Sequence, residues 1–126
     1  MVILSAGWLQ YGPFEQITNI EVQRHININV LHVIYCAKVL TSHLVAHHDS
    51  TGKKGALIIL SSLQALFACA GCTTYSATKV FDHYLAQGLA VELAGKVDVM
   101  SYIPGLVDTP FIRDKQLKKD RQSMMV

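Results

Sequence analysis

Charge and low-complexity sequence are both scarce in this chain. Asp, Glu, Lys and Arg make up only 16% of its 126 residues, and the formal net charge is +2. An ordinary globular domain has about 25% charged residues. No repeats or polar tracts interrupt a composition that is 51% hydrophobic. The low charge excludes a disordered chain and an extended basic surface, so we expect a buried core and no nucleic-acid partner.

The few charges are unevenly distributed. Residues 113–126 hold five basic and two acidic side chains, a net +3 that leaves −1 for the rest of the chain. A basic tail of this kind can bind phosphate or a membrane surface, but a solvated chain terminus is favoured.

Cysteine is also rare, because three cysteines are too few for the disulfide framework of a small secreted protein. Cys69 and Cys72 have the C-x-x-C spacing of a redox pair or of half a zinc site. No second pair of this kind accompanies them, which favours two small buried loop residues. His43 and His47 have the i, i+4 spacing of a metal pair, but without a third ligand a solvated helix end is favoured and we expect no metal.

Long apolar runs are missing as well. No run approaches the roughly 18 residues of a membrane span. The first residues, MVILSAGWL, lack the basic leader and the length of a secretion signal. We therefore expect an intracellular protein without a transmembrane segment.

What the sequence does contain is an alternation of short apolar runs and longer amphipathic segments. Apolar runs bounded by turn residues predict strands at 1–4, 56–60 and 97–103. Helical periodicity predicts helices at 18–46 and 74–94. The order β-α-β-α-β is typical of an α/β fold with a parallel sheet and crossover helices.

An apolar stripe at helical spacing supports each predicted helix. The first stripe is formed by Ile26, Val30, Val33, Ala37, Leu40 and Leu44. The second stripe is formed by Ala77, Phe81, Tyr84, Gly88 and Val91.

The predicted sheet lacks a cover on one side. Right-handed crossovers place both helices on the same face when three parallel strands lie side by side in order. Yet the strand at 56–60, ALIIL, is apolar at every position, as in a strand that is buried on both faces. We therefore predict that residues 1–126 form a single partial domain of a larger layered α/β structure.

Tyr75 and Lys79 stand four residues apart at the start of the second predicted helix, so both lie on one helical face. A Tyr and a Lys at this spacing commonly only cap and solvate a helix. Ser62 at a strand end is explained equally well as a turn residue, and Asn29 as a side chain that bonds a carbonyl one turn back. Taken one by one, these residues therefore have structural explanations as well as catalytic ones.

With Ser62 thirteen residues before Tyr75 and PGLVDT after the third strand, the chain resembles the short-chain dehydrogenase/reductase family over nearly its whole length. The resemblance implies a partial Rossmann-like, doubly wound parallel sheet and the catalytic residues Asn29, Ser62, Tyr75 and Lys79. The residues it places along the coenzyme, NAD or NADP, are Ala6, Gly7, Tyr75, Lys79, Pro104, Gly105, Val107 and Thr109. Within the family, ININVL, KKGALIILSS and YSATKVFDHYLAQGL are most similar to the hydroxysteroid dehydrogenase and very-long-chain 3-oxoacyl-CoA reductase branch.

The chain departs from the family pattern in one large respect. The family opens with a T-G-x-x-x-G-x-G turn that lets the backbone approach a pyrophosphate at a helix N-terminus, and this motif does not occur in the sequence. The family's N-N-A-G also reads Leu4-Ser5-Ala6-Gly7. The resemblance is thus to the catalytic half without the dinucleotide-binding half. We expect the chain alone to be inactive and to bind dinucleotides weakly or not at all.

A reductase of this family protonates a carbonyl oxygen while hydride reaches its carbon. An ammonium about 4 Å from a phenol, at an effective dielectric of about 20, is worth roughly 4 kcal/mol, which would bring the pKa of Tyr75 to about 7. We expect Ser62 to hold the same oxygen, and Asn29 to fix a water that resupplies protons through Lys79.

The sequence therefore predicts an NAD(P)-dependent oxidoreductase domain for a hydrophobic carbonyl or alcohol of the steroid or 3-oxoacyl type. The apolar loop 63–72 suits a wall of the substrate pocket or a partner contact. The alternative is a non-catalytic truncated relative, because in the family the two long helices pair between subunits, as a homo-oligomer or with a partner chain. An incomplete gene model is a third possibility. We expect a location in the cytoplasm or at the cytoplasmic face of the endoplasmic reticulum.

Overall fold

The computed structural model describes residues 1–109, so the basic segment 113–126 lies outside the described residues. Strands β1 (Val2–Leu4), β2 (Gly55–Leu60) and β3 (Val97–Tyr102) form a parallel sheet in the order β1-β2-β3. The predicted α/β class and the β-α-β-α-β order are confirmed.

The first crossover is one long helix made of three consecutive segments. These are α1 (Asn19–His25), the π-helical turn η2 (Ile26–Leu31) and α2 (His32–Thr51). The helix therefore extends five residues beyond its predicted end, and its middle contains a wider turn that the apolar pattern does not indicate.

Local sequence explains where this long helix begins and ends. The Thr18 hydroxyl accepts a hydrogen bond from the Glu21 backbone N–H at 3.2 Å, and the Glu21 carboxylate accepts one from the Thr18 backbone N–H at 2.8 Å. This reciprocal capping box fixes the first turn. Gly52, with φ of 70°, ends the helix in the left-handed conformation that glycine adopts without steric cost.

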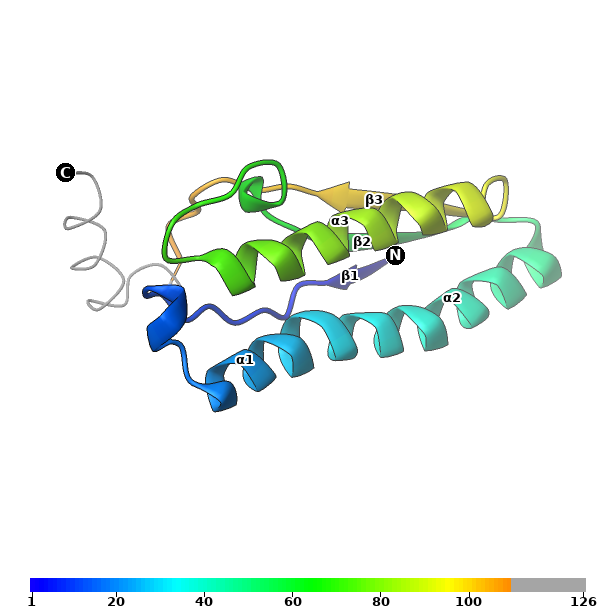
Figure 1. Ribbon diagram of the computed structural model, residues 1–126. Helices are drawn as coiled ribbons and strands as arrows, with labels where there is room; N and C mark the ends of the chain where they lie inside the picture. Colours follow the sequence, from blue (N-terminus) through cyan, green and yellow to red (C-terminus); the bar gives the residue numbers. More distant parts are fainter. Residues whose placement is uncertain (110–126) are drawn as a thin grey trace.

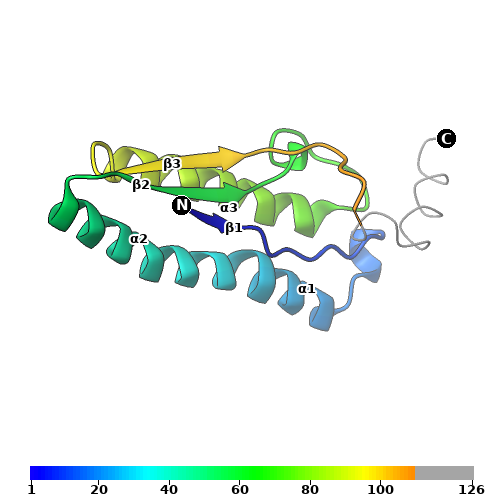
Figure 2. The same cartoon turned by 180° about the vertical axis from the view of Figure 1, so that it is seen from behind.

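The second crossover contains the short 3₁₀ helix η3 (Leu63–Ala65) and the long helix α3 (Thr73–Glu92); a further 3₁₀ helix, η1 (Phe14–Gln16), precedes α1. Both long helices cover the same face of the sheet, in front of the strands in Figure 1 and behind them in Figure 2. The core between the helices and the sheet contains Leu4, Val33, Ala37, Leu57, Ile59 and Ala86.

The opposite face of the sheet is uncovered by the described residues, as predicted. Ile3, Met100 and Tyr102 alternate with core-facing residues along their strands and are 50%, 48% and 51% exposed. Figure 2 shows this face with the strands in front. The described residues thus form two layers, the sheet and the helices on one side of it.

The apolar stripe that predicts α3 lies on the outer face of the helix, away from the sheet. Tyr84 and Val91 of this stripe are 67% and 79% exposed. The face that packs against the sheet instead carries Lys79, Asp82 and Ala86, all buried. The apolar stripe therefore indicates the wrong face of α3 as the buried one. Lys79 and Asp82 can face inward because they form an ion pair with each other.

Within residues 1–109, one helix is long and apolar enough to cross a membrane by length and composition, namely Asn19–Thr51. This differs from the expectation that no such segment exists. Core helices of globular domains meet the same criterion, and here Val33 and Ala37 of this helix are buried in the core. The finding is weak support for a membrane span.

A ring cluster joins the segment after β1 to the long helix. The His25 ring lies with its centroid 4.6 Å from that of Trp8, and the Arg24 guanidinium lies 4.7 Å from the centroid of the Trp8 ring. The Gln10 backbone N–H points at His25 Nε2 at 3.2 Å, so Nε2 is the acceptor. The proton of the neutral ring is therefore on Nδ1, which donates to the Glu21 carbonyl at 3.0 Å.

Mild acid is expected to destabilise the chain through His25. Burial lowers the pKa of His25 below its ordinary value of 6.5, although hydrogen bonding to the Glu21 carbonyl opposes this. As the pH falls, the unfolded chain takes up this proton before the folded chain does. The contribution of His25 to the free energy of unfolding is therefore constant above about pH 6.5 and decreases as the pH drops toward the folded-state pKa. Urea midpoints between about pH 7.5 and about pH 5.5 measure this slope. His25→Phe should reduce the slope and exposed His32→Phe should not; equal slopes in wild type and His25→Phe would contradict the assignment.

Candidate active site

Asn29 lies in the π-helical turn and connects three parts of the fold. Its Oδ1 accepts a hydrogen bond from the Trp8 backbone N–H at 2.8 Å. Its Nδ2 donates to the Trp8 carbonyl at 2.8 Å and to Thr78 Oγ1 at 3.0 Å. The side chain is 0% exposed. The alternative that Asn29 bonds a carbonyl one turn back is wrong, and the amide instead ties the segment after β1 to α3.

Gly7 lies where that segment passes the start of α3. A Cβ on Gly7 would lie 3.7 Å from Lys79 Nζ and 3.9 Å from Asn29 Oδ1. Three of the residues chosen from the sequence therefore meet at the carboxyl end of β1. Gly7 and the preceding Ala6 are exposed, so their backbone is open to a ligand.

The two serines at the end of β2 have different surroundings. Ser61 is buried, and its hydroxyl donates to the Lys79 carbonyl at 2.7 Å, so it joins β2 to α3. Ser62 follows and accepts a hydrogen bond from the Gln64 backbone N–H at 3.3 Å, and its hydroxyl lies close enough to the Tyr75 phenol to oppose the rise of the phenol's pKa. The structure thus brings Ser62 and Tyr75 together, thirteen residues apart in the chain.

Lys79 extends along the inner face of α3 toward the same point. Its Nζ lies 5.8 Å from the centroid of the Tyr75 ring. Nζ donates to the Leu60 carbonyl at 2.9 Å and to Asp82 Oδ2 at 2.8 Å. An ammonium has three N–H donors, so these two bonds leave one for a ligand.

The expected acidification of Tyr75 is wrong in direction. Burial raises the pKa of the Tyr75 hydroxyl above its ordinary value, hydrogen bonding with Ser62 opposes the rise, and the Asp82 charge adds to it, followed by Cys72. The Lys79 charge alone would acidify the phenol, but the loss of hydration and the neighbouring Asp82 carboxylate act in the opposite direction. Tyr75 therefore keeps its proton at neutral pH.

Asp82 is the residue that sequence reasoning missed. It is fully buried, and burial raises the pKa of its carboxyl while the Lys79 ammonium opposes the rise. The available signal was the spacing Lys-x-x-Asp, because an acidic side chain one helical turn after Lys79 faces the same side of α3.

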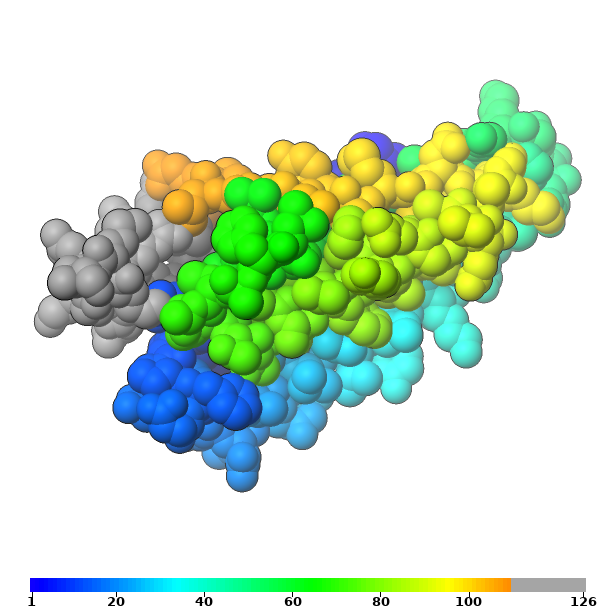
Figure 3. Space-filling model, turned by 45° about the horizontal axis from the view of Figure 1, so that its top comes forward, coloured from blue at the N-terminus to red at the C-terminus, as the bar shows by residue number. Residues whose placement is uncertain are grey.

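The segment after β3 approaches the site through Leu63. The Leu63 backbone N–H donates to the Pro104 carbonyl at 3.0 Å, which places Pro104 next to the residue that follows Ser62. A Cβ on Gly105 would lie 3.2 Å from Leu63 Cδ1. Val107, which is 51% exposed, and Thr109 continue along this segment. Figure 3 shows the segment (orange) beside residues 63–72 (bright green).

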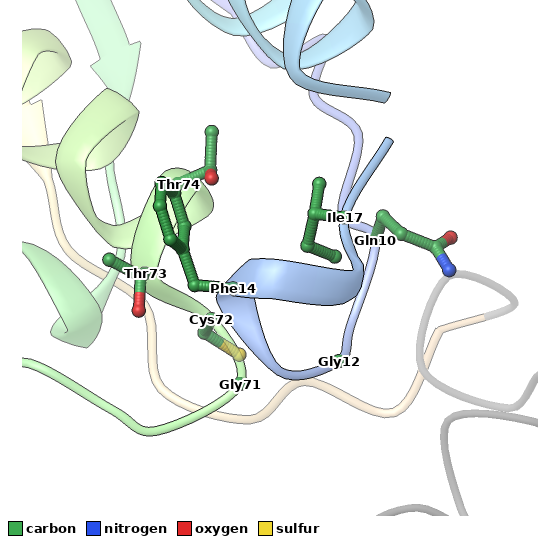
Figure 4. A pocket seen from close by; sticks show the side chains of 8 residues that line it. All are labelled: Gln10, Gly12, Phe14, Ile17, Gly71, Cys72, Thr73 and Thr74. Atoms are coloured by element: carbon green, nitrogen blue, oxygen red, sulfur yellow. The ribbon is translucent and has the colours of Figure 1, made fainter. Parts of the chain in front are cut away.

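A narrow crevice lies nearby but is a poor candidate for the site. It is lined from one side by the segment around η1 and from the other by the start of α3. Figure 4 shows Phe14 extending from η1 toward Thr74. The crevice does not admit a water-sized sphere, and the Gly12 backbone N–H closes it by bonding the Gly71 carbonyl at 3.0 Å.

The cysteine and histidine patterns do not form a metal centre within residues 1–109. Cys69 and Cys72 are not joined in a disulfide, with Cys72 buried and Cys69 partly exposed. No group of three or more His, Cys, Asp or Glu side chains that could hold a metal ion occurs in this part of the chain.

Comparison with known proteins identifies the family. The family model described as short chain dehydrogenase matches residues 1–120. A 3-alpha-(or 20-beta)-hydroxysteroid dehydrogenase of Mycobacterium tuberculosis (strain CDC 1551 / Oshkosh) is 30% identical over 87% of this chain and 41% of that protein. An uncharacterised oxidoreductase of Staphylococcus aureus (strain MRSA252) is 33% identical over 86% of this chain and 46% of that protein. The chain therefore belongs to the short-chain dehydrogenase family.

Solved structures agree on the fold. A 3-ketoacyl-(acyl-carrier-protein) reductase from Brucella melitensis, complexed with NADH, has a TM-score of 0.81 at 23% identity and is matched over 97% of this chain and 50% of its own. The NADH-dependent reductase A1-R', responsible for alginate metabolism, has a TM-score of 0.78 at 26% identity, over 88% of this chain and 47% of its own. The chain thus spans about half, or less, of the proteins it resembles.

Proposed function

We propose that the chain is the catalytic part of an NAD(P)-dependent oxidoreductase that interconverts a hydrophobic carbonyl compound and its alcohol. The observation that carries the proposal is the meeting of Ser62, Tyr75 and Lys79 beside the exposed backbone of Gly7. The carboxyl ends of β1 and β2 create this meeting point, which is where open parallel α/β sheets bind their ligands.

The described residues fit the reactive end of a dinucleotide. Gly7 leaves open the space that a Cβ would take beside Lys79 Nζ, and the remaining Lys79 N–H is available to donate to a hydroxyl of the coenzyme. We assign Ala6, Pro104, Gly105, Val107 and Thr109 to the same binding surface. The sequence supplies no glycine-rich pyrophosphate cradle.

The chemistry of this chain is acid catalysis. A bound nicotinamide coenzyme supplies the hydride and is oxidised. Tyr75 donates its proton to the carbonyl oxygen as the C=O bond becomes a C–O single bond, and Ser62 holds that oxygen by a hydrogen bond. A tyrosine that stays protonated at neutral pH suits reduction, because the acid is present in the form that the step consumes.

Exposed apolar side chains beside the site support a hydrophobic substrate. Leu63, Leu66 and Phe67 are 41%, 58% and 57% exposed, and Leu106 across from them is 66% exposed. A steroid or a 3-oxoacyl chain has the apolar surface to cover such a wall. The similarity to a hydroxysteroid dehydrogenase supports the same substrate class. We place the protein inside the cell, in the cytoplasm or at the cytoplasmic face of the endoplasmic reticulum.

A second candidate function is protein binding without catalysis. The outer faces of α2 and α3 expose Tyr35 (64%), Val39 (58%), Tyr84 (67%) and Val91 (79%). Apolar residues gathered on two helices favour a contact with a second copy or a partner chain. This surface is separate from the site, so coenzyme-dependent turnover distinguishes the two functions.

Coenzyme titration tests the proposal. We expect the chain alone to give no saturable change in NADPH fluorescence, because the pyrophosphate has no cradle. A chimera that joins the dinucleotide-binding half of the Mycobacterium tuberculosis relative to this chain should bind NADPH or NADH. Micromolar binding by the chain alone would contradict the division into halves. A folded chimera that binds neither coenzyme would count against the oxidoreductase proposal.

A further inference from the structure

Asp82 is a buried carboxylate next to the site, and its only described bond is to Lys79. The Oδ2 atom lies 2.8 Å from Lys79 Nζ, and the two side chains are 0% and 5% exposed. A buried ion pair seldom adds net stability, because both charges lose their hydration. The pair is therefore better explained by its effect on the site than by its contribution to the fold.

Two acceptors from different elements hold the Lys79 ammonium. The Leu60 carbonyl at the end of β2 accepts at 2.9 Å, and Asp82 accepts from within α3. In this position Nζ lies 5.8 Å from the centroid of the Tyr75 ring and 3.7 Å from the place that a Cβ on Gly7 would take. Without Asp82 the flexible lysine side chain would keep a single described anchor.

The second carboxylate oxygen of Asp82 does not build a structural network. Oδ1 is buried and has no hydrogen-bond partner among the described residues. Buried carboxylates that stabilise a fold normally have partners for both oxygens. What Asp82 contributes is thus its charge and its single bond to Lys79.

The Asp82 charge acts on Tyr75 against the Lys79 charge. A nearby cation favours the ionised phenol, and a nearby anion disfavours it. With the two charges 2.8 Å apart, much of the field of the ammonium at Tyr75 is cancelled. The Asp82 charge indeed contributes to the raised pKa of Tyr75, after burial.

Few other ionisable groups face these residues. The strands β1 and β2 and the turns η2 and η3 contain no ionisable side chain. On β3, Asp98 and Tyr102 are exposed and alternate with the residues that face α3. On α1, burial lowers the pKa of His25 below its ordinary value, and both ring nitrogens have backbone partners. His83 of α3 itself bonds Ser101 at 2.9 Å.

The groups that remain near Tyr75 are Cys72, one turn before it on the chain, and the pair of Lys79 and Asp82. Partly exposed Glu21 and exposed Arg24 complete the charges of α1, and Glu21 is committed to the capping box with Thr18.

We propose that Asp82 is a positioning residue: it holds the Lys79 ammonium close to Gly7 and Tyr75 and cancels its charge, so that Tyr75 keeps its proton until a carbonyl oxygen takes it. The inference rests on the proposed function for its chemistry. The experimental test does not depend on the proposed function, because the coupling of Asp82 to Tyr75 is present in the chain without coenzyme or turnover.

Spectroscopic titration of Tyr75 tests the inference. Tyrosinate absorbance is followed against pH in the full chain, and subtraction of the Tyr75→Phe curve isolates Tyr75. Asp82→Asn keeps the size of the side chain and removes its charge, so the Tyr75 midpoint should move to lower pH by about 1 to 3 pH units. Exposed Asp98→Asn is the matched control and should leave the midpoint in place. An unchanged midpoint in Asp82→Asn overturns the inference.

A double variant gives the test a second readout if Asp82→Asn does not fold. Lys79→Met combined with Asp82→Leu removes both charges, and we expect the Tyr75 midpoint to stay within about half a pH unit of wild type, since two cancelling charges are lost together. A rise of about one unit or more would mean that Lys79 acts uncancelled, and would overturn the inference. If the chimera shows no turnover while Asp82→Asn still moves the midpoint, the proposed function fails and the coupling stands.

Discussion

Replacement of Lys79 by Met is expected to lower the free energy of unfolding by about 3–5 kcal/mol, the cost of leaving a buried charge without its partner. Asp82 is 0% exposed and has no other described hydrogen-bond partner. Urea unfolding followed by circular dichroism measures the effect. Lys96→Met is the matched control, because Lys96 bonds Asp49 at 3.0 Å on the surface and both side chains are about half exposed. Surface pairs of this kind contribute about 0–1 kcal/mol.

The pH dependence gives the Lys79→Met prediction a signature. Burial raises the pKa of Asp82 above its ordinary value of 3.8. A raised folded-state pKa means that the folded chain binds the proton more tightly, so stability is retained at low pH and lost as the pH rises through that pKa. The destabilisation in Lys79→Met should therefore shrink as the pH is lowered. Addition of Asp82→Leu should restore stability at neutral pH, and a double variant as unstable as Lys79→Met would contradict the account.

Tyr75→Phe is expected to lower kcat/KM of the chimera for a hydrophobic ketone by about 10²–10⁴, the usual worth of a positioned general acid. Ser62→Ala should cost about 10²–10³ if its hydroxyl holds the developing oxyanion. Coenzyme affinity should change little in Tyr75→Phe, because the ring and Lys79 remain. The measurement is the rate of NADPH oxidation at saturating coenzyme. Tyr84→Phe is the control, since Tyr84 lies on the outer face of the same helix and is 67% exposed.

Much of the architecture follows from the sequence for simple reasons. Three apolar runs separated by helical periodicity require parallel strands, and right-handed crossovers then place both helices on one face. The same topology brings the ends of β1 and β2 together, so Gly7, Ser62, Tyr75 and Lys79 were bound to lie near one another once their order matched the family. Their catalytic roles remain predictions.

The electrostatics of the site were not predictable from the spacing of Tyr75 and Lys79. The pair alone suggests an acidified phenol, but burial and a third residue reverse the direction. Asp82 has no signal in the hydrophobic pattern, because the apolar stripe that predicts the orientation of α3 lies on the outer face of the helix. When the buried face of a helix carries an ion pair, hydrophobicity alone predicts the wrong face as buried.

The π-helical turn around Asn29 is the other feature without a sequence signal. ININVL has ordinary helical spacing of its apolar residues, yet the wider turn places the Asn29 amide where it bonds both backbone groups of Trp8. Such turns occur often at functional sites. The partners of Asn29 are set by the path of the chain after β1, which local sequence does not specify.

Transfer of deuterium is the most direct test of the central claim that the residues around Tyr75 direct hydride transfer to a carbonyl. The chimera is given coenzyme deuterated at the transferred position and a hydrophobic ketone, and the alcohol is analysed by mass spectrometry. The account predicts one deuterium on the carbinol carbon with wild-type sequence, and formation of that product at least about a hundredfold slower in Tyr75→Phe with coenzyme binding retained. A chimera that binds coenzyme and ketone without forming labelled alcohol, or equal rates with and without the Tyr75 hydroxyl, would contradict it.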